Sequence, residues 1–209
     1  MTSVDRTTTT DVGKTIGMTV IYAGLDLEEA VGELAGAGFE AAEVFVGHLG
    51  PRVVPAPVLE AHAAAGAEVL SKQGLAVSTL NCIVGAFDPF SSDGSLEQTA
   101  RGLARHLRLG AAMGAPRVLV WDGELDEADL LPHAPARLAR IIERGRELSG
   151  LREVPEVAVE LHPNTFGFKH RLHEEVAQAL VGVGAGVCLD FCGRVAGGNL
   201  TPRLPRIPA

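Results

Sequence analysis

Short apolar runs alternate with longer amphipathic segments between residues 18 and 192 of the chain. The runs are rich in Val, Ile, Leu and Ala with few polar residues between them, which is typical of strands that are covered on both faces. The segments between the runs place apolar residues at helical spacing, and the last of them spans residues 172–184. The pattern therefore predicts an α/β fold with six strands. We expect these strands over residues 18–25, 41–46, 75–83, 117–123, 157–163 and 185–192.

Capping signals mark the ends of the predicted helices independently of the apolar pattern. Asp26 and Ser95 precede helical segments, and each is predicted to accept a hydrogen bond from a backbone N–H of the first turn. Gly38, Gly74 and Gly114 fall just after helical segments, where a left-handed backbone conformation ends a helix. The helix boundaries are therefore predicted from two kinds of signal.

Six β/α repeats are compatible with a barrel and with an open doubly wound sheet. No GxGxxG follows the first predicted strand and no GxxxxGK[ST] occurs in the chain, so the nucleotide-binding sheets lose their main support. Carboxylates end several predicted strands, at Glu43, Asp122, Glu160 and Asp190. A barrel builds its active site from several strand ends in this way, so we favour a (β/α) TIM-barrel type of fold with about six of the eight β/α units.

The composition is that of one globular domain, with 209 residues of which 46% are hydrophobic. The net charge of −8 and the mixing of basic with acidic residues lead us to expect no nucleic-acid partner. No run of about 18 apolar residues occurs, so we expect no membrane partner. Three cysteines read as free thiols of a reducing compartment, and the N-terminus lacks an apolar signal core, so we expect a cytoplasmic protein.

Two strand ends carry the most informative chemical pattern. The apolar part of VAVELHPNTF (157–166) ends in Glu160, and that of GVCLDFCG (186–193) ends in Asp190. A helix separates them, and the right-handed crossover of a βαβ unit makes the two strands parallel, so both carboxylates are expected at one edge of the sheet. Two acids at this edge, with His162 beside one of them, indicate a divalent cation and a proton-transfer base.

These motifs, in this order, resemble those of the xylose isomerase-like TIM barrels, a superfamily that includes sugar isomerases, sugar epimerases, inosose dehydratases and endonuclease IV. The resemblance covers residues 17–198 and also rests on GFEAAEVF and HLRLGAAMGAPRVLVWDG. It implies that Glu160 and Asp190 are the metal ligands that end the fifth and sixth strands. A His and a Glu from the seventh and eighth strands complete the coordination in that family. Glu43 corresponds to the acid that often ends the second strand, near the substrate.

The sequence departs from the family pattern in two ways. Gly193 stands where many members carry a His three residues after the sixth-strand Asp. The chain also ends before a seventh and an eighth unit, so we expect a C-terminally truncated barrel without those two ligands. Residues 1–16 are predicted to be a disordered extension, and the proline-rich residues 199–209 an irregular tail. Open strands at the barrel edges would need a cover, for which a homo-oligomer is one candidate.

The resemblance and the strand-end acids together predict a metal-assisted isomerase or epimerase of a small sugar, sugar phosphate or cyclitol. It would transfer a proton next to a carbonyl, with Glu160 as the catalytic residue and a Mn, Mg or Co ion on Glu160 and Asp190. The alternative is a non-catalytic truncated family member that acts as a binding or assembly partner. The residues expected to bind the substrate are His162, Glu43, Trp121, Asp122 and Asn81.

Overall fold

Six strands form one parallel sheet, in the order β1-β2-β3-β4-β5-β6. This computed structural model describes residues 15–50, 55–83, 90, 96–125, 127–163 and 165–189. Each strand pairs with the next one along the chain, which is the order of a barrel wall, so the predicted α/β fold with six parallel strands is confirmed. The strands are β1 (Ile16–Met18), β2 (Ala41–Phe45), β3 (Ala76–Asn81), β4 (Arg117–Trp121), β5 (Glu156–Leu161) and β6 (Gly186–Leu189).

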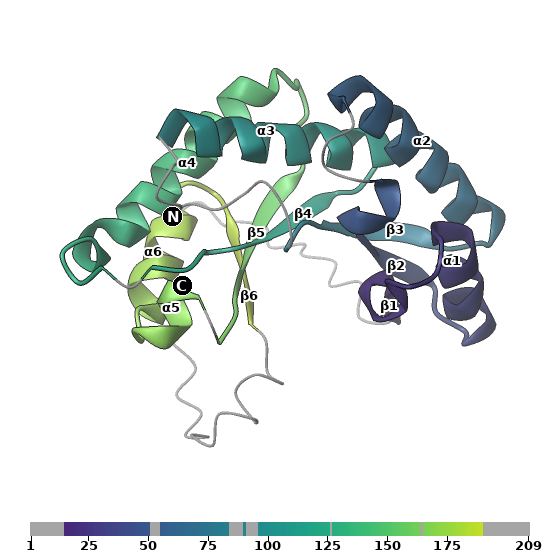
Figure 1. Ribbon diagram of the computed structural model, residues 1–209, viewed down its shortest axis with the longest axis horizontal. Coiled ribbons are helices and arrows are strands. Elements are labelled where there is room, and N and C mark those ends of the chain that lie inside the picture. Colours follow the sequence, from purple (N-terminus) through teal and green to yellow (C-terminus); the bar gives the residue numbers. More distant parts are fainter. Residues whose placement is uncertain are drawn as a thin grey trace, which may run out of the picture.

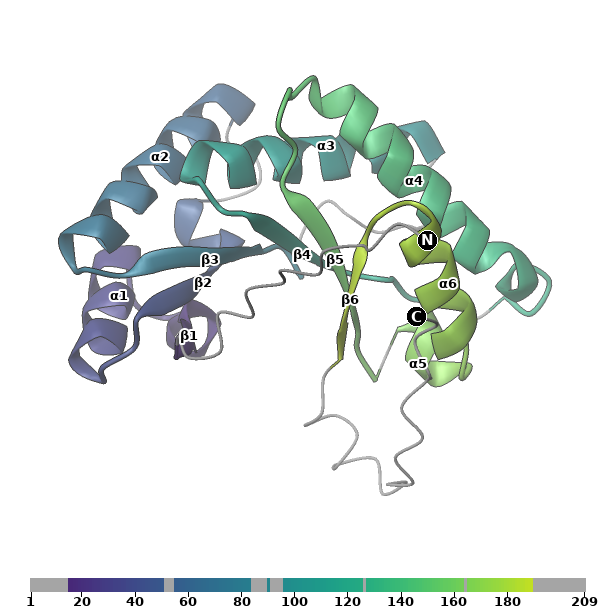
Figure 2. The same ribbon diagram turned by 180° about the vertical axis from the view of Figure 1, so that it is seen from behind.

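The described α-helices connect the strands and lie along the outer side of the sheet, which curves into an arch (Figure 1). Figure 2 shows the same layering from behind. No helix in the described part of the chain has the length and apolar character to cross a membrane. The α-helices are α1 (Leu27–Gly36), α2 (Ala56–Lys72), α3 (Leu96–Met113), α4 (Ala134–Ser149), α5 (Phe166–Lys169) and α6 (His173–Gly182), and the 3-10 helices are η1 (Thr19–Tyr22), η2 (Val46–Leu49) and η3 (Leu131–His133).

The main core lies between the sheet and these helices. Successive side chains of a strand point to opposite faces, so every second strand residue packs against the helical layer. The strand residues buried in this core are Ala42, Val44, Leu80, Val118, Val120, Val157, Val159 and Leu161. The strand residues that alternate with these face the inner side of the arch. They include the predicted site residues Glu43, Asn81, Trp121 and Glu160.

The first strand is shorter than its sequence predicts. We expect a strand over residues 18–25, but β1 covers Ile16–Met18 and η1 follows at once. The hydroxyl oxygen of Thr19 accepts the backbone N–H of Phe45 at 2.8 Å. The Thr19 side chain thus accepts the Phe45 N–H of β2, which a backbone carbonyl of a longer β1 would otherwise accept. The pairing between β1 and β2 therefore ends at Met18. The apolar run was misleading because Ile21 is 69% exposed rather than buried.

The predicted capping signals are confirmed where the structure describes them. Asp26 caps α1 in a capping box, in which its side chain accepts the Glu29 N–H at 2.9 Å and the Glu29 side chain accepts the Asp26 N–H at 3.2 Å. Gly38, Gly74 and Gly114 have φ angles of 84°, 74° and 71° after their helices. The predicted cap at position 95 lies outside the described residues, as do the predicted tail and nearly all of the predicted N-terminal extension.

We predict that Asp26→Ala lowers the free energy of unfolding by about 1 kcal/mol, because α1 loses a side-chain acceptor at its N-terminus. Chemical denaturation monitored by far-UV circular dichroism measures the loss. The matched control is Glu28→Ala, which removes an acid from the same turn without touching the capping box. Equal stability of the Asp26→Ala variant and the parent would contradict the capping role.

Candidate functional site

Four neighbouring strands bring predicted site residues to their carboxyl ends. The register pairs Trp121 at the end of β4 with Glu160 of β5, and Glu160 in turn with Cys188 of β6. On the other side of the site, Phe45 of β2 pairs with Asn81, the last residue of β3. Because all these strands are parallel, their carboxyl ends share one rim of the sheet, where α/β barrels place their chemistry.

Trp121, Glu160 and His162 form one connected group at this rim. The indole Nε1–H of Trp121 donates to Oε2 of Glu160 at 3.1 Å. The imidazole of His162 stacks on the indole, with 4.4 Å between ring centroids and 21° between ring planes. All three side chains are half-buried. The structure therefore brings Glu160, the predicted catalytic residue, into contact with Trp121, which was predicted to bind the substrate. His162, another predicted substrate-binding residue, stacks on the Trp121 ring.

Glu43 and Asn81 form a second group, on β2 and β3. The amide Nδ2–H of Asn81 donates to Oε1 of Glu43 at 2.6 Å, and the Asn81 Oδ1 accepts the backbone N–H of Ile83 at 3.1 Å. These two bonds fix which way the amide faces. Burial raises the pKa of Glu43, and the bond from Asn81 partly offsets that increase. Asn81 itself is only 1% exposed, so the half-buried Glu43 is the more accessible member of this pair.

Asp122 occupies a different environment from the other predicted residues. It follows Trp121 directly, and its side chain has no exposed surface. The backbone N–H of Gly167 donates to its Oδ2 at 2.7 Å, beside the core residues Leu161 and Val176. Consecutive residues turn to opposite sides and Trp121 takes the inner one, so the side chain of Asp122 is covered here, and its contact with a substrate stays a prediction.

The environment of Asp122 changes its acidity. Burial raises the pKa of this carboxyl from 3.8 to about 6, and the charge of Glu160 adds to the increase. Its neighbours Thr165 and the Gly167 N–H oppose the shift without cancelling it. Two carboxyl groups at this end of the sheet thus influence each other electrostatically, although only Glu160 has exposed surface.

The turn between β5 and α5 makes hydrogen bonds that the sequence did not predict. Thr165 bonds the carbonyl oxygen of His162 twice, through its backbone N–H at 2.9 Å and its hydroxyl at 2.7 Å. The N–H of Phe166 donates to the carbonyl of Gly123, which follows Asp122 on the neighbouring strand, at 2.8 Å. Thr165 is at the N-cap position of α5, but its hydroxyl donates back to His162 and does not cap the helix, and this helix is too short for the apolar pattern to reveal.

The described residues do not form a metal site by themselves. Within them, no group of three or more His, Cys, Asp or Glu side chains has an arrangement that could hold an ion. Asp190, the second predicted ligand, lies outside the described residues. Carboxylate oxygens are suitable donors for Mg²⁺ and Mn²⁺, so Glu160 fits the predicted ion by its chemistry, but one carboxylate is not a complete donor set.

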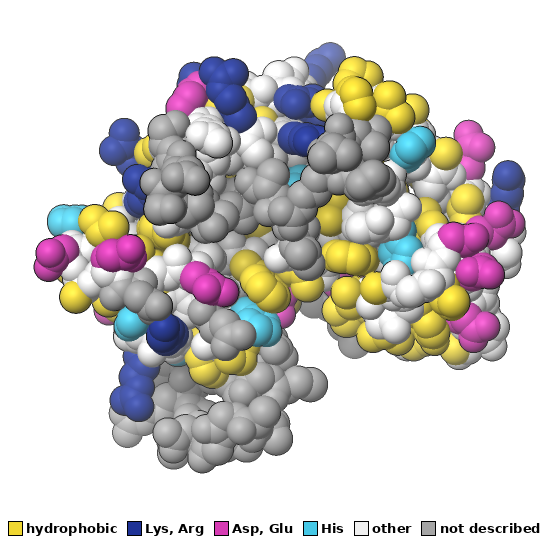
Figure 3. All heavy atoms as spheres, viewed as in Figure 1, with side chains coloured by type: hydrophobic (Ala, Val, Ile, Leu, Met, Phe, Trp, Pro, Cys, Tyr) yellow, Lys and Arg dark blue, Asp and Glu magenta, His cyan; other side chains and the backbone are white. Residues whose placement is uncertain are grey.

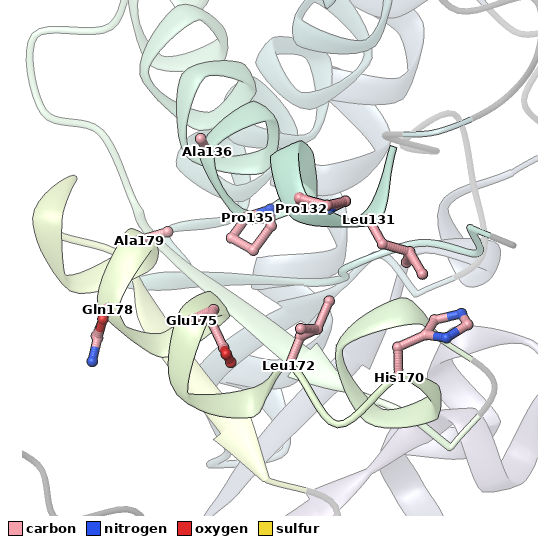
Figure 4. A pocket seen from close by; sticks show the side chains of 9 residues that line it. All are labelled: Leu131, Pro132, Pro135, Ala136, His170, Leu172, Glu175, Gln178 and Ala179. Atoms are coloured by element: carbon pink, nitrogen blue, oxygen red, sulfur yellow. The ribbon is translucent and has the colours of Figure 1, made fainter. Parts of the chain in front are cut away.

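A pocket of about 840 Å³ lies elsewhere, on the outer side of the sheet between η3, α4, α5 and α6 (Figure 4). Leu131, Pro132, Leu172 and other apolar residues form most of its wall, with Glu175 and His170 among the polar ones. None of the predicted site residues lines it. This pocket is therefore separate from the group at the strand ends.

The charged side chains are unevenly distributed over the surface. Figure 3 shows acidic side chains gathered over α1 at one end of the molecule, and Lys and Arg side chains mainly along the side of α3 and α4. Several of these arginines are paired with acids, such as Arg144 with Glu97 at 2.8 Å and Arg108 with Glu60 at 3.2 Å. The arginines of these pairs are partly neutralised by their partners.

The model of the xylose isomerase-like TIM barrel family matches residues 31–201 of the chain. The match covers most of the chain, and the sheet order agrees with it, so the chain belongs to this family. The resemblance on which the sequence analysis relies is thereby confirmed. No curated protein matches the chain in sequence.

Solved structures with the same fold come from several kinds of enzyme. A sugar phosphate isomerase/epimerase from Parabacteroides distasonis matches with a TM-score of 0.63 and 14% identity, over 90% of this chain and 72% of that one. Endonuclease IV from Thermus thermophilus matches with a TM-score of 0.58 and 22% identity, over 88% of this chain. D-allulose 3-epimerase from a Methylomonas species matches with a TM-score of 0.54 and 13% identity, over 89% of this chain. At these identities the likeness shows the fold. The chain spans 64% of the endonuclease and 65% of the allulose epimerase.

The raised pKa of Asp122 predicts a pH-dependent effect of Asp122→Asn on stability. Because the folded-state pKa of about 6 lies above the ordinary 3.8, the folded chain binds more protons between these values, and the contribution of Asp122 falls as pH rises through about 6. We therefore expect the stability of Asp122→Asn relative to the parent to increase between pH 4 and pH 7, by up to about 3 kcal/mol. Denaturant titrations at four pH values measure this difference, and a constant difference would contradict the shifted pKa.

Proposed function

We propose that this chain has the catalytic carboxylate and part of the substrate site of a metal-assisted isomerase or epimerase that acts on a small sugar, sugar phosphate or cyclitol. Membership of the family and the epimerase and isomerase folds among its structural neighbours support this class. The observation that carries the proposal is the arrangement of Glu160, which lies at the rim of the sheet and is oriented by the indole N–H of Trp121.

Glu160 is the proposed base. Such a reaction removes a proton from the carbon next to a carbonyl, and a half-buried carboxylate that is oriented by a hydrogen bond is suited to take and return it. The Trp121 N–H bonds one oxygen of the carboxylate and so limits rotation of the side chain. A base that is oriented before the substrate arrives loses less freedom in the transition state.

The remaining predicted residues have proposed roles in holding the substrate. His162 is stacked on Trp121, and these two rings provide a flat surface beside the base on which a sugar ring or chain would lie. Glu43, oriented by Asn81, provides a carboxyl group that would bond a substrate hydroxyl from the β2 side. These residues approach from two pairs of strands, which gives the substrate contacts on two sides.

Glu160 and Asp190 are the residues that we propose to hold a divalent cation. The sequence places Asp190 two residues after Cys188, the residue of β6 that pairs with Glu160. When bound, a Mn²⁺, Mg²⁺ or Co²⁺ ion would act as a Lewis acid on adjacent substrate oxygens. Two carboxylates with water in the other positions would bind such an ion weakly, with a dissociation constant on the order of 1 mM.

A second function, that of a non-catalytic binding or assembly partner, is favoured by one observation. The described residues contain no group of three potential ligands, so the catalytic proposal depends on a metal that these residues do not hold alone. A homo-oligomer that covers the strands at the edges of the sheet remains a prediction under both functions. The two functions differ in whether the chain binds a metal and exchanges a substrate proton.

We predict that Mn²⁺ stabilises the folded chain through Glu160 and Asp190. At a tenfold excess over the dissociation constant, an ion that binds only the native state adds about 1.4 kcal/mol to the free energy of unfolding. Glu160→Gln and Asp190→Asn should each remove most of this gain, because each removes a charged ligand while keeping the side-chain shape. Thermal unfolding with and without Mn²⁺, supported by calorimetric titration, measures it.

The matched control for the metal experiment is Glu156→Gln. Glu156 lies at the opposite end of β5, where it forms an exposed ion pair with Arg117 at 2.7 Å, so its loss should leave the Mn²⁺ effect intact. A Mn²⁺ effect that is unchanged in Glu160→Gln and Asp190→Asn would mean that both carboxylates are structural. It would favour the non-catalytic function.

We also predict that Glu160 is required for proton exchange on a ketose. In D₂O with Mn²⁺, the chain should incorporate deuterium at the carbon next to the carbonyl of a suitable ketose or ketose phosphate, and Glu160→Gln should reduce the rate at least about 100-fold. Proton NMR of the sugar measures the exchange. Equal exchange by the parent and by Glu160→Gln would contradict the assignment of the base.

A further inference from the structure

The turn between β5 and α5 is tied to the buried carboxylate of Asp122, which directly follows the neighbouring strand β4. Asp122 accepts the N–H of Gly167 at 2.7 Å from one end of this turn. At the other end, His162 is bonded through its carbonyl oxygen by both the backbone and the hydroxyl of Thr165. A continuous set of hydrogen bonds and covalent links therefore leads from Asp122 to the ring that stacks on Trp121.

We propose that Asp122 is a positioning residue, which holds the β5–α5 turn so that His162 stacks on Trp121 and the indole N–H stays directed at Glu160. The inference deepens the proposed function, and it rests on that function only for the role of Glu160 as a base. Asp122 acts through the turn and not by contact with a substrate, because its side chain has no exposed surface.

The packing around Gly167 shows why the connection is sensitive to small changes. A Cβ atom at this position would lie 2.7 Å from Oδ2 of Asp122, 3.2 Å from Leu161 and 3.3 Å from Val176. Only a glycine brings its backbone N–H this close to the carboxylate, and a charged acceptor makes the resulting bond a strong one. The position of the turn is thus set both by a hydrogen bond and by a steric limit.

Burying the Asp122 carboxylate lowers the stability of the fold, so packing alone does not explain its presence. Its Oδ1 has no hydrogen bond of regular geometry among the described residues, although the Thr165 side chain and the backbone of Asp122 lie close enough to lower the pKa of the carboxyl. A buried ionisable group with an unsatisfied oxygen destabilises a fold, and such groups are concentrated at functional sites. This loss of stability is consistent with a carboxyl group that is retained because it holds the β5–α5 turn in place.

The chain contains its own reporter for this inference. Trp121 is its single tryptophan, and it touches both His162 and Glu160. Its fluorescence therefore reports whether the imidazole is stacked on the indole, and this readout needs neither a metal nor a substrate. A general loss of stability in a protein that is still folded would not change it.

The experiment compares the Trp121 emission spectra of five folded variants. Asp122→Ala should shift the emission to that of His162→Ala, because in both variants the indole loses the stacked imidazole. Combining the two substitutions should add no further shift. Asp122→Asn keeps an oxygen that accepts the Gly167 N–H, so it should restore most of the parental spectrum. Leu70→Ala, a core truncation on α2 far from the turn, is the control for destabilisation and should keep the parental spectrum.

Gly167→Ala provides the test if Asp122→Ala does not fold. Its added methyl group pushes the turn away from the carboxylate, so its emission should shift in the same direction as that of His162→Ala. A parental spectrum in the folded Asp122→Ala or Gly167→Ala variant would overturn the inference. If the variants show the predicted fluorescence shifts but the chain exchanges no substrate proton, the proposed function is overturned and the positioning role of Asp122 stands.

Discussion

Parallel pairing of neighbouring strands is the constraint on which the other features of this structure depend. Each of the strands β1 to β5 is followed by a helix on the outer side, so the chain returns to start the next strand at the same end of the sheet. The register then decides which residues meet, and it sets Trp121 opposite Glu160. A shift of one residue between β4 and β5 would turn one of these two side chains into the helical core and break the contact between them.

Hydrogen bonds hold each of the carboxyl groups at this end of the sheet. Glu43 is held by Asn81, Glu160 by Trp121, and Asp122 by the backbone of Gly167. Burial raises the pKa values of Glu43 and Asp122, which means that the fold opposes their charged forms. Such an arrangement costs stability and orients the carboxyl groups, a compromise that is common at active sites and is consistent with the proposed function.

The sequence predicted the architecture well because its signals are local. Strands β2 to β6 begin and end within about three residues of the apolar runs, and the capping box at Asp26 and the left-handed Gly38 follow from residue type alone. The extent of the first strand was predicted wrongly, because an apolar run does not reveal that the Thr19 hydroxyl will accept the backbone N–H of Phe45 on β2. Helix α5 has four residues, too few to show a helical period.

The sequence predicted which polar residues gather at the strand ends, but not how their side chains are arranged. Strand ends identify Glu43, Glu160 and their neighbours, because parallel topology brings such positions together. The stack of His162 on Trp121 depends on side-chain rotamers and on the path of the β5–α5 turn, which no spacing encodes. The burial of Asp122 was missed for a similar reason, since the turn that covers it comes from a different β/α unit.

The most direct test of the central claim, that these strand ends form a metal-assisted site, is a crystal structure of the chain soaked in a manganese salt. Anomalous scattering locates Mn²⁺ without reference to any assumed ligand. The account predicts an anomalous peak at the carboxyl ends of β5 and β6, within coordination distance of Glu160 and Asp190. A peak at another place, or no peak at this rim when the crystals are saturated with manganese, would contradict it.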